Sequence, residues 1–238
     1  DWSSDVCSSD LEAIIYKVEK GRTVEVDDMI HGKISFNTDE IKDQVMIKSD
    51  GSPAYNFCCV VDDDDMGVTH IIRGDDHFTN TFRQAQIYQA MGWDLPVFAH
   101  IPLIHGKDGG KLGKRHGAMA VTAYRDMGYL PEAMRNYLLR LGWSHGDDEI
   151  ISTEQAIDWF GLEGVGKAAA KFDFDKLDAL NAHYLRTMPA DELLAEHIAP
   201  LLEREIGRTL LPEETERLMT LMPHLTQRAK RLPQVIES

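Results

Sequence analysis

The hydrophobic pattern of the chain changes character at Gly117, and this change sets the fold class. Before this point, the apolar residues fall in short runs of strand length, interrupted by one helical stretch at about 81–91. After it, they recur at helical spacing, at 132–141, 156–160, 175–184, 191–206, 213–222 and from 227 onward. The sequence therefore predicts an α/β region followed by an all-α region.

Two groups of strands are expected in the first region. Short alternating runs predict four β-strands between residues 11 and 48, at 13–16, 23–26, 33–36 and 44–47. The continuous apolar run 54–61 is typical of a strand buried on both faces of a parallel sheet, and 68–72 and 97–104 predict two more strands. This order of strand, helix and strand is typical of a doubly wound α/β layer.

Length, charge and cysteine content exclude several classes of protein. With 238 residues, 43% of them hydrophobic, the chain can bury a sizeable core, and no run approaches the roughly 18 apolar residues that cross a bilayer. The net charge of −15 argues against a nucleic-acid partner. However, residues 1–110 hold 9 Lys and Arg against 20 Asp and Glu, whereas residues 111–238 hold 16 against 20, so the second half can carry a local basic face. Three cysteines without a C-x-x-C spacing fit a reducing, cytoplasmic location and predict no zinc site.

A glycine-rich basic segment follows the predicted strand 97–104. Residues 106–117 contain five glycines, four Lys or Arg and one His. Flexible loops at the carboxyl ends of parallel strands are where open α/β sheets bind ligands, and cations there can neutralise a polyphosphate. The alternative is an exposed, solvated loop, and composition alone favours neither interpretation.

A second polar cluster, residues 73–77, follows the predicted strand 68–72. Arg73 can bind a carboxylate through two parallel hydrogen bonds, and the acids and histidine beside it can bind an amine or a ribose hydroxyl. The structural alternative is that Arg73 pairs with an Asp while the remaining residues cap the next helix. Taken alone, the cluster favours this structural alternative.

Two other groups of residues resemble metal ligands only superficially. The acidic run 62–65 lacks the spacing of a calcium loop, and we expect it to be a solvated strand end. His100 and His105 flank an apolar strand, and we expect them to satisfy backbone groups and not to bind a metal.

Four segments, in order along the chain, closely resemble the bacterial type of glutamyl-tRNA synthetase, a class I aminoacyl-tRNA synthetase. They are SDGSPAYNFCCVVDDDDMGVTHIIRGDDH, FAHIPLIHGKDGGKLGKRHGA, YRDMGYLPEAMRNYLLRLGWS and GLEGVGKAAAKFDFDKLDALNAHYLR. The resemblance runs from about Leu11 to the C-terminus. Several motifs in the right order are far more specific than any single pattern match.

The resemblance implies an enzyme that activates L-glutamate with ATP and Mg²⁺ and transfers the glutamyl group to the 3′ end of tRNA(Glu). The signature loop of this family, usually Lys-Leu-Ser-Lys-Arg, matches Lys111, Leu112, Gly113, Lys114 and Arg115. By this match, Lys114 stabilises the triphosphate in the adenylation transition state, and Lys111 and Arg115 assist it.

The same resemblance implies roles for residues outside the loop. Tyr55 and Arg73 match the Tyr and Arg of the glutamate pocket, in agreement with the carboxylate binding argued for Arg73 above. The backbone of Leu103 and Ile104 is implied to meet adenine. Asp76 lies where the family places an acid near the amino acid and ATP.

Three departures from the family pattern stand out. Gly113 replaces the usual Ser of the signature loop, and Asp75 stands where many members have Glu. The other class I signature, His-x-Gly-His, does not occur in the sequence, and the first βαβ half of the nucleotide fold has no counterpart. We therefore expect an internal fragment that cannot perform adenylation by itself.

The resemblance also predicts the domain organisation. Residues 1–10 are expected to be a disordered segment or an assembly scar, and 11–48 the end of the acceptor-binding insertion. Residues 49–117 correspond to the second half of the Rossmann-like catalytic domain. A helical stem-contact region is expected at 118–188, and the start of a helical anticodon-binding domain at 189–238.

Three alternatives to this interpretation stay open. Glutaminyl-tRNA synthetases share the catalytic half but are expected to continue into a β-barrel, whereas the residues after Arg186 are predicted to be helical. The glutamyl-queuosine tRNA synthetases lack an anticodon-binding domain altogether. A non-catalytic module that binds tRNA or another partner is favoured by the missing signature and by Gly113. No feature predicts an obligate oligomer, so a monomer is expected.

Overall fold

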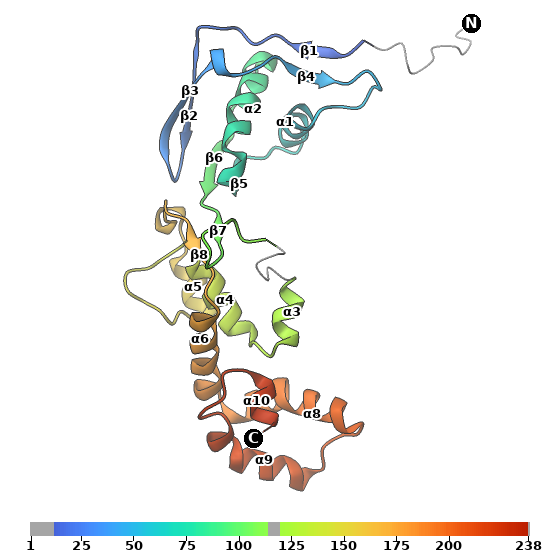
Figure 1. The fold of residues 1–238 in the computed structure, drawn as a ribbon, viewed down its shortest axis with the longest axis vertical. Helices are drawn as coiled ribbons and strands as arrows, with labels where there is room; N and C mark the ends of the chain where they lie inside the picture. Colours follow the sequence, from blue (N-terminus) through green and yellow to red (C-terminus); the bar gives the residue numbers. More distant parts are fainter. Residues whose placement is uncertain (1–11, 114–119, 238) are drawn as a thin grey trace, which may run out of the picture. The chain divides into compact units, whose positions relative to one another are not determined.

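The computed structural model describes residues 12–113 and 120–237 and divides the chain into two compact units. The first unit runs up to Leu103 and includes Val165–Lys167; the second contains Ile104–Gly164 and the residues from Ala168 onward. In the first unit, four strands precede two α-helices that alternate with two further strands, whereas helices dominate the second unit (Figure 1). The predicted α/β region followed by an all-α region is confirmed.

The first unit is built on a four-stranded mixed sheet with the strand order β3-β2-β6-β5. Strand β2 (Thr23–Asp28) pairs antiparallel with β3 (Gly32–Asn37) and parallel with β6 (Val97–Ile101), and β6 pairs parallel with β5 (His70–Gly74). Alternate residues of β2 are buried, as expected for a strand with one face on the core. Strands β1 (Ile14–Tyr16) and β4 (Gln44–Ile47) form a separate antiparallel pair.

Two helices pack against these strands. They are α1 (Tyr55–Asp65) and α2 (Phe78–Met91), and single 3₁₀ turns precede β4 and α2 at η1 (Thr38–Glu40) and η2 (Asp75–His77). The buried core joins the inner face of α2 to β2 and β6 through side chains such as Phe82, Ala85 and Phe98. Helix α2 ends at Gly92, whose left-handed backbone (φ +73°) stops the helix at that point.

The predicted strand at 54–61 is wrong, because this segment forms helix α1. Only Val60 of α1 is buried, so the segment packs on one side and is not covered on both faces. A short apolar run cannot be assigned to strand or helix by periodicity alone, and here the packing against α2 decides the outcome. The acids 62–65 are therefore the last turn of a helix and not a strand end.

Smaller differences concern where elements begin and end. The predicted strand 68–72 is β5 (His70–Gly74), and the predicted strand 97–104 divides at Pro102 into β6 and the short β7 (Ile104–His105). Proline lacks the N–H that a strand interior needs, which explains the break. Helix α2 begins at Phe78, three residues earlier than predicted.

The second unit is formed by helices on either side of a two-residue parallel bridge between β7 and β8 (Ala170–Lys171). A capping box opens the helix that begins at Thr153: the Gln155 amide donates to Ser152 Oγ, and the Ser152 amide donates to Gln155 Oε1. The helices described in the second unit are α3 (Val121–Asp126), α4 (Pro131–Arg140), α5 (Thr153–Trp159), the 3₁₀ turn η4 (Leu162–Gly164), α6 (Phe174–Thr187), α7 (Ala190–Glu192), the π-helical η5 (Leu193–Ile198), α8 (Ala199–Ile206), α9 (Pro212–Leu225) and α10 (Leu232–Ile236).

A hydrogen-bonded and ion-paired contact closes the second unit on itself. Asn181 of α6 accepts from the Leu130 amide (2.8 Å) and donates to the Lys230 carbonyl (2.6 Å). Asp178, one turn earlier, receives both Nε (2.8 Å) and Nη2 (3.2 Å) of Arg231. Residues between 49 and 53 positions apart in the sequence are thus held together around α6.

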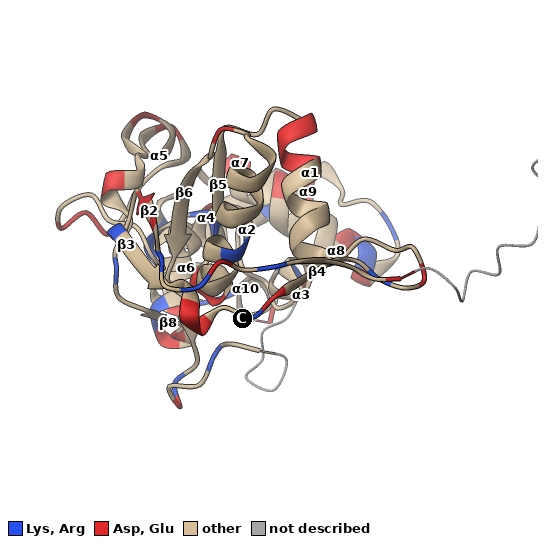
Figure 2. Cartoon of the chain, turned by 90° about the horizontal axis from the view of Figure 1, so that it is seen from above, with Lys and Arg blue, Asp and Glu red and all other residues tan. Residues whose placement is uncertain are grey.

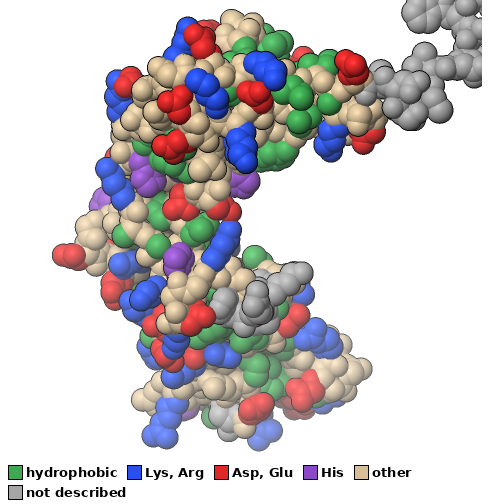
Figure 3. All heavy atoms as spheres, turned by 45° about the horizontal axis from the view of Figure 1, so that its top comes forward, with side chains coloured by type: hydrophobic (Ala, Val, Ile, Leu, Met, Phe, Trp, Pro, Cys, Tyr) green, Lys and Arg blue, Asp and Glu red, His purple; other side chains and the backbone are tan. Residues whose placement is uncertain are grey.

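Charged side chains are distributed over both units. Asp and Glu are interspersed with Lys and Arg along the ribbon (Figure 2) and on the face of the molecule shown in Figure 3. Among the described residues, no helix is long and apolar enough to cross a membrane.

Candidate functional site

The candidate site is built around Arg73, near the carboxyl end of β5. The parallel pairing of β5 with β6 places Arg73 opposite His100. Arg73 Nε donates to His100 Nε2 (3.2 Å), and Arg73 Nη2 donates to Thr81 Oγ1 of α2 (2.7 Å). The guanidinium carbon also lies 5.7 Å from the centre of the Phe98 ring. Both hydrogen-bond partners are uncharged acceptors, so these bonds hold the guanidinium in place without neutralising it.

His100 is itself held by Asp28, the last residue of β2. Asp28 Oδ2 accepts from His100 Nδ1 (2.7 Å) and from the His100 amide (3.1 Å). Asp28 Oδ1 accepts from the amides of Ile30 (2.9 Å) and His31 (2.8 Å). The side chains of Asp28 and His100 are both completely shielded from solvent. The side chains of Asp28, His100, Thr81 and Arg73 are called the Arg73 network below.

Burial and hydrogen bonding together set the protonation of this network. Burial by itself raises the pKa of Asp28, but the hydrogen bonds from the His31 amide and from His100 outweigh it, so the pKa of Asp28 lies below its usual value. Burial lowers the pKa of His100, and the attraction of Asp28 only partly offsets this. We therefore assign an ionised Asp28 and a neutral His100 whose proton is on Nδ1.

Helix α1 contributes a row of side chains that interact electrostatically with Arg73. Tyr55, Cys59 and Asp63 lie at successive i, i+4 positions and therefore on one face of the helix. Burial raises the pKa of Tyr55, the hydrogen-bonded thiol of Cys59 raises it further, and Arg73 opposes the shift. Burial likewise raises the pKa of Asp63 while Arg73 lowers it. Tyr55 is 55% exposed, so this side of the site is open to solvent.

Asp76 and Leu103 meet at Gly74, the last residue of β5. A Cβ on Gly74 would lie 2.6 Å from Asp76 Oδ1 and 3.6 Å from Leu103 Cδ2. A side chain at position 74 would therefore require the Asp76 carboxylate to shift, whereas it would be in ordinary van der Waals contact with Leu103. The structure brings together two residues that the sequence analysis had placed near the nucleotide.

The first part of the signature loop forms a hairpin within the second unit. The Gly106 amide donates to the Gly110 carbonyl (2.9 Å), the Leu112 amide donates to the Ile104 carbonyl (2.8 Å), and His105 bridges to Lys111. Lys114 and Arg115 lie outside the described residues. Among the described residues, a Cβ on Gly113 would meet the Lys111 carbonyl at 3.8 Å, which is ordinary van der Waals contact.

Lys107 forms ion pairs with two carboxylates of the second unit. Its ammonium lies 2.9 Å from Asp175 Oδ2 and 3.5 Å from Asp173 Oδ1, both at the beginning of α6. One of the four cations counted in the segment 106–117 therefore has two carboxylate partners.

The two histidines of this region have different partners from one another. His105 Nδ1 lies 2.9 Å from the Gly109 carbonyl, so it satisfies a backbone group as predicted. The expectation for His100 is wrong, because its ring bonds to the side chains of Asp28, Thr81 and Arg73. Within residues 12–113 and 120–237, no group of three or more His, Cys, Asp or Glu is arranged to hold a metal ion.

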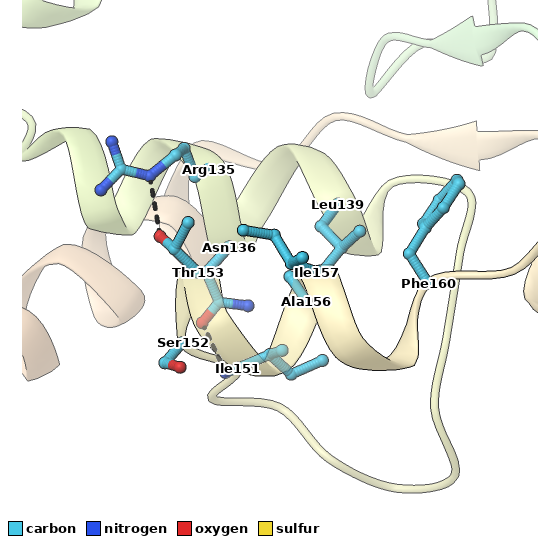
Figure 4. A pocket seen from close by; sticks show the side chains of 9 residues that line it. All are labelled: Arg135, Asn136, Leu139, Ile151, Ser152, Thr153, Ala156, Ile157 and Phe160. Carbon is cyan, nitrogen blue, oxygen red and sulfur yellow. Dashed lines mark hydrogen bonds between the residues drawn. The ribbon is translucent and has the colours of Figure 1, made fainter.

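A separate concave surface lies wholly within the second unit. This cavity of about 380 Å³ lies between α4 and α5 (Figure 4) and is lined mainly by apolar side chains, among them Leu139, Ile157 and Phe160. Its charged lining residue, Arg135, donates to Thr153 Oγ1 (3.1 Å) and Glu132 Oε1 (2.7 Å). This charge is thus engaged with the protein itself, and we assign no chemistry to the cavity.

Sequence reasoning missed the groups behind Arg73. Asp28 and Thr81 lie in a strand and a helix that no sequence motif brings together. Cys59 was missed because its segment was predicted to be a strand. Residues four positions apart also lie on one face of a strand, but the neighbours of that face differ from those of a helix face. Spacing of i, i+4 and i+8 from Tyr55 would have revealed this face if the segment had been taken as a helix.

The family-model comparison decides which family the site belongs to. Residues 7–179 match the model described as tRNA synthetases class I (E and Q), catalytic domain. This chain belongs to that family. It is 56% identical to glutamate–tRNA ligase 2 of Paramagnetospirillum magneticum over 219 residues, which are 92% of this chain and 46% of the relative. It is also 56% identical to glutamate–tRNA ligase 2 of Parvibaculum lavamentivorans over 215 residues, 90% of this chain and 44% of the relative.

A solved structure agrees with these relatives. The crystal structure of a glutamate tRNA ligase from Elizabethkingia meningosepticum in complex with its amino acid superposes with a TM-score of 0.84 at 34% identity. The superposition covers 94% of this chain and 48% of that one. This class I synthetase chain thus spans about half the length of the relatives that it matches.

Proposed function

We propose that this class I synthetase chain forms the glutamate-binding side of a glutamate–tRNA ligase. Such an enzyme joins L-glutamate to ATP, releasing pyrophosphate, and then transfers the glutamyl group to the 3′ end of tRNA(Glu). The observation that carries the proposal is the half-buried guanidinium of Arg73, which is held by uncharged groups beside an exposed tyrosine. Its positive charge, which these partners do not neutralise, and its planar geometry suit a carboxylate ligand.

In this proposal, each element of the site has its own role. Arg73 binds a carboxylate of L-glutamate, and the phenol of Tyr55 offers a further hydrogen bond to the same ligand. Asp76 lies between the amino acid and ATP. The backbone of Leu103 and Ile104 meets adenine.

The phosphates of ATP are assigned to the cations of the signature loop, which are Lys111, Lys114 and Arg115. Mg²⁺ arrives bound to ATP and neutralises part of the phosphate charge. We also propose that the helical residues from 118 contact the tRNA stem, that those from 189 begin the anticodon-binding domain, and that the protein acts as a cytoplasmic monomer.

A hybrid enzyme tests the proposal. Residues 12–237 replace the matching segment of the Paramagnetospirillum magneticum relative, and ATP–pyrophosphate exchange is measured with L-glutamate. We expect exchange that depends on glutamate and that Arg73→Ala lowers roughly 100-fold in kcat/KM for glutamate, because a charged hydrogen bond worth about 3 kcal/mol is lost.

The matched control is Arg83→Ala, which removes an exposed arginine from α2 and should leave exchange unchanged. Exchange that L-glutamine supports better than L-glutamate would contradict the proposal. So would a folded hybrid whose activity does not respond to Arg73→Ala.

A further inference from the structure

The Arg73 network joins four elements that are distant in the sequence. Asp28 ends β2, Arg73 lies on β5, Thr81 on α2 and His100 on β6. Asp28 and His100 are 72 residues apart, and Thr81 is completely buried, as is His100. Polar groups buried this deeply are costly unless each one finds a partner, and in this network each does.

The direction of every hydrogen bond in the network follows from Asp28. An ionised carboxylate only accepts, so His100 must carry its proton on Nδ1, 2.7 Å away. A neutral imidazole protonated at Nδ1 has a lone pair on Nε2. That lone pair accepts from Arg73 Nε (3.2 Å) and faces the Thr81 hydroxyl (2.9 Å). The Thr81 oxygen in turn accepts from Arg73 Nη2 (2.7 Å).

Further contacts keep the imidazole ring in this orientation. Phe78 packs edge-on against His100 with ring centres 5.0 Å apart, and Phe98 stacks on it at 6.2 Å. His31 Nε2 lies 3.1 Å from the His100 carbonyl. The His100 ring can therefore not turn to exchange its two nitrogens without displacing buried neighbours.

We propose that Asp28, through His100 and Thr81, is a positioning residue that fixes the guanidinium of Arg73 for the glutamate carboxylate. Arginine has five N–H groups in a rigid plane, and the network engages only Nε and Nη2. The network does not use Nη1 or the second N–H of Nη2, so these donors are the ones assigned to the ligand, and their direction is set by the anchored side of the plane. The inference rests on the proposed function for its ligand, but the geometry of the network does not depend on it.

The substitution Asp28→Asn tests the direction of the hydrogen bonds. The side-chain oxygen of the substituted residue is needed by the amides of Ile30 and His31, so its NH₂ group would face His100. His100 would then be driven to carry its proton on Nε2, where it opposes the donor of Arg73.

Two measurements test this expectation. The matched control is Asp27→Asn, the same substitution at the neighbouring exposed residue. Long-range ¹H–¹⁵N NMR of the full chain should show the His100 proton on Nδ1 in the unsubstituted protein and in Asp27→Asn, and on Nε2 in Asp28→Asn. In the hybrid enzyme, Asp28→Asn should raise KM for glutamate at least tenfold while KM for ATP changes less than twofold. A general loss of folded enzyme would lower the apparent kcat and leave both KM values unchanged, so a rise in KM for glutamate alone separates positioning from stability.

A second pair of variants serves if Asp28→Asn does not fold. His100→Gln can place an amide oxygen where Nε2 accepts from Arg73, whereas the shorter His100→Asn cannot reach that position. We expect the Gln variant to keep KM for glutamate within about threefold and the Asn variant to raise it at least tenfold.

Three results would overturn the proposal: a proton on Nε2 in the unsubstituted protein, equal KM values for the two His100 variants, or a tautomer change in Asp28→Asn without a change in KM for glutamate. Failure of the proposed function gives a different pattern. In that case Arg73→Ala would leave glutamate exchange unaffected, while the NMR measurement would still report whether Asp28 sets the His100 tautomer.

Discussion

At the scale of single residues, Gly128 occupies a position that has no room for a side chain. Its φ is +87°, and a Cβ there would overlap Pro233 and lie 2.9 Å from the Leu232 amide nitrogen. We expect Gly128→Ala to lower the free energy of unfolding by roughly 2–4 kcal/mol, because left-handed strain and steric overlap add. Urea denaturation measures this change.

The control is Gly207→Ala, at another left-handed glycine (φ +72°), where the added Cβ would meet no described residue within 4 Å. It should cost only about 1 kcal/mol, since strain alone applies. Equal losses for the two variants would show that the overlap at Gly128 relaxes without cost.

Glu214 makes the stability of the C-terminal helices depend on pH. Two hydrogen bonds from Arg208 and one from the Leu211 amide lower the pKa of Glu214 to about 2. A carboxyl whose pKa is depressed on folding contributes stability above its unfolded pKa, about 4.3, and this contribution is lost as the pH falls towards 2. We expect the free energy of unfolding to fall more steeply from pH 5 to pH 2 in the unsubstituted chain than in Glu214→Gln. Parallel curves for the two proteins would rule out this contribution.

At the scale of elements, helix α1 carries four acids where a helix favours cations. Asp62–Asp65 occupy its last turn, near the negative end of the helix dipole. We expect Asp65→Lys to stabilise the protein by about 0.5 kcal/mol, measured as a higher urea midpoint. Glu213→Lys makes the same change of charge in the first turn of α9 and should be destabilising. A shift of the same sign in both variants would mean that the dipole is not the cause.

Helix α1 also shows which parts of the fold could be predicted from the sequence. Strands with alternating burial, such as β2, and capped helices, such as α5, carry local signals and were predicted correctly. The segment 54–61 carries no such signal, because its apolar residues are continuous and its state is set by contact with α2. For the same reason, Tyr55 and Arg73 could be proposed from motifs, whereas Asp28 and Thr81 could not: only the folded sheet brings them to Arg73.

At the scale of the whole molecule, the second unit is closed by a contact between residues 53 positions apart. Arg231 pairs with Asp178 through two nitrogens and lies 4.8 Å from the centre of the Tyr129 ring. We expect Arg231→Lys to lower the free energy of unfolding by about 1–2 kcal/mol, since lysine keeps the charge but loses the paired geometry and the stacking. Thermal unfolding measures this loss of stability, and the control is Arg228→Lys at an exposed neighbouring position. Equal losses of stability in the two variants would contradict the prediction.

The pairing of Lys107 also bears on how fast a nucleotide would reach the signature loop. Positive charges on a protein attract an anionic ligand before contact and so raise its association rate. Salt screens this attraction, so the rate falls more steeply with ionic strength when more of these positive charges are uncompensated. Because Lys107 faces Asp173 and Asp175, it contributes little to this attraction. Its ammonium instead offsets the repulsion of these two carboxylates. Replacing Lys107 with an uncharged residue would leave both carboxylates uncompensated, so ATP association should become slower and should fall less steeply with ionic strength.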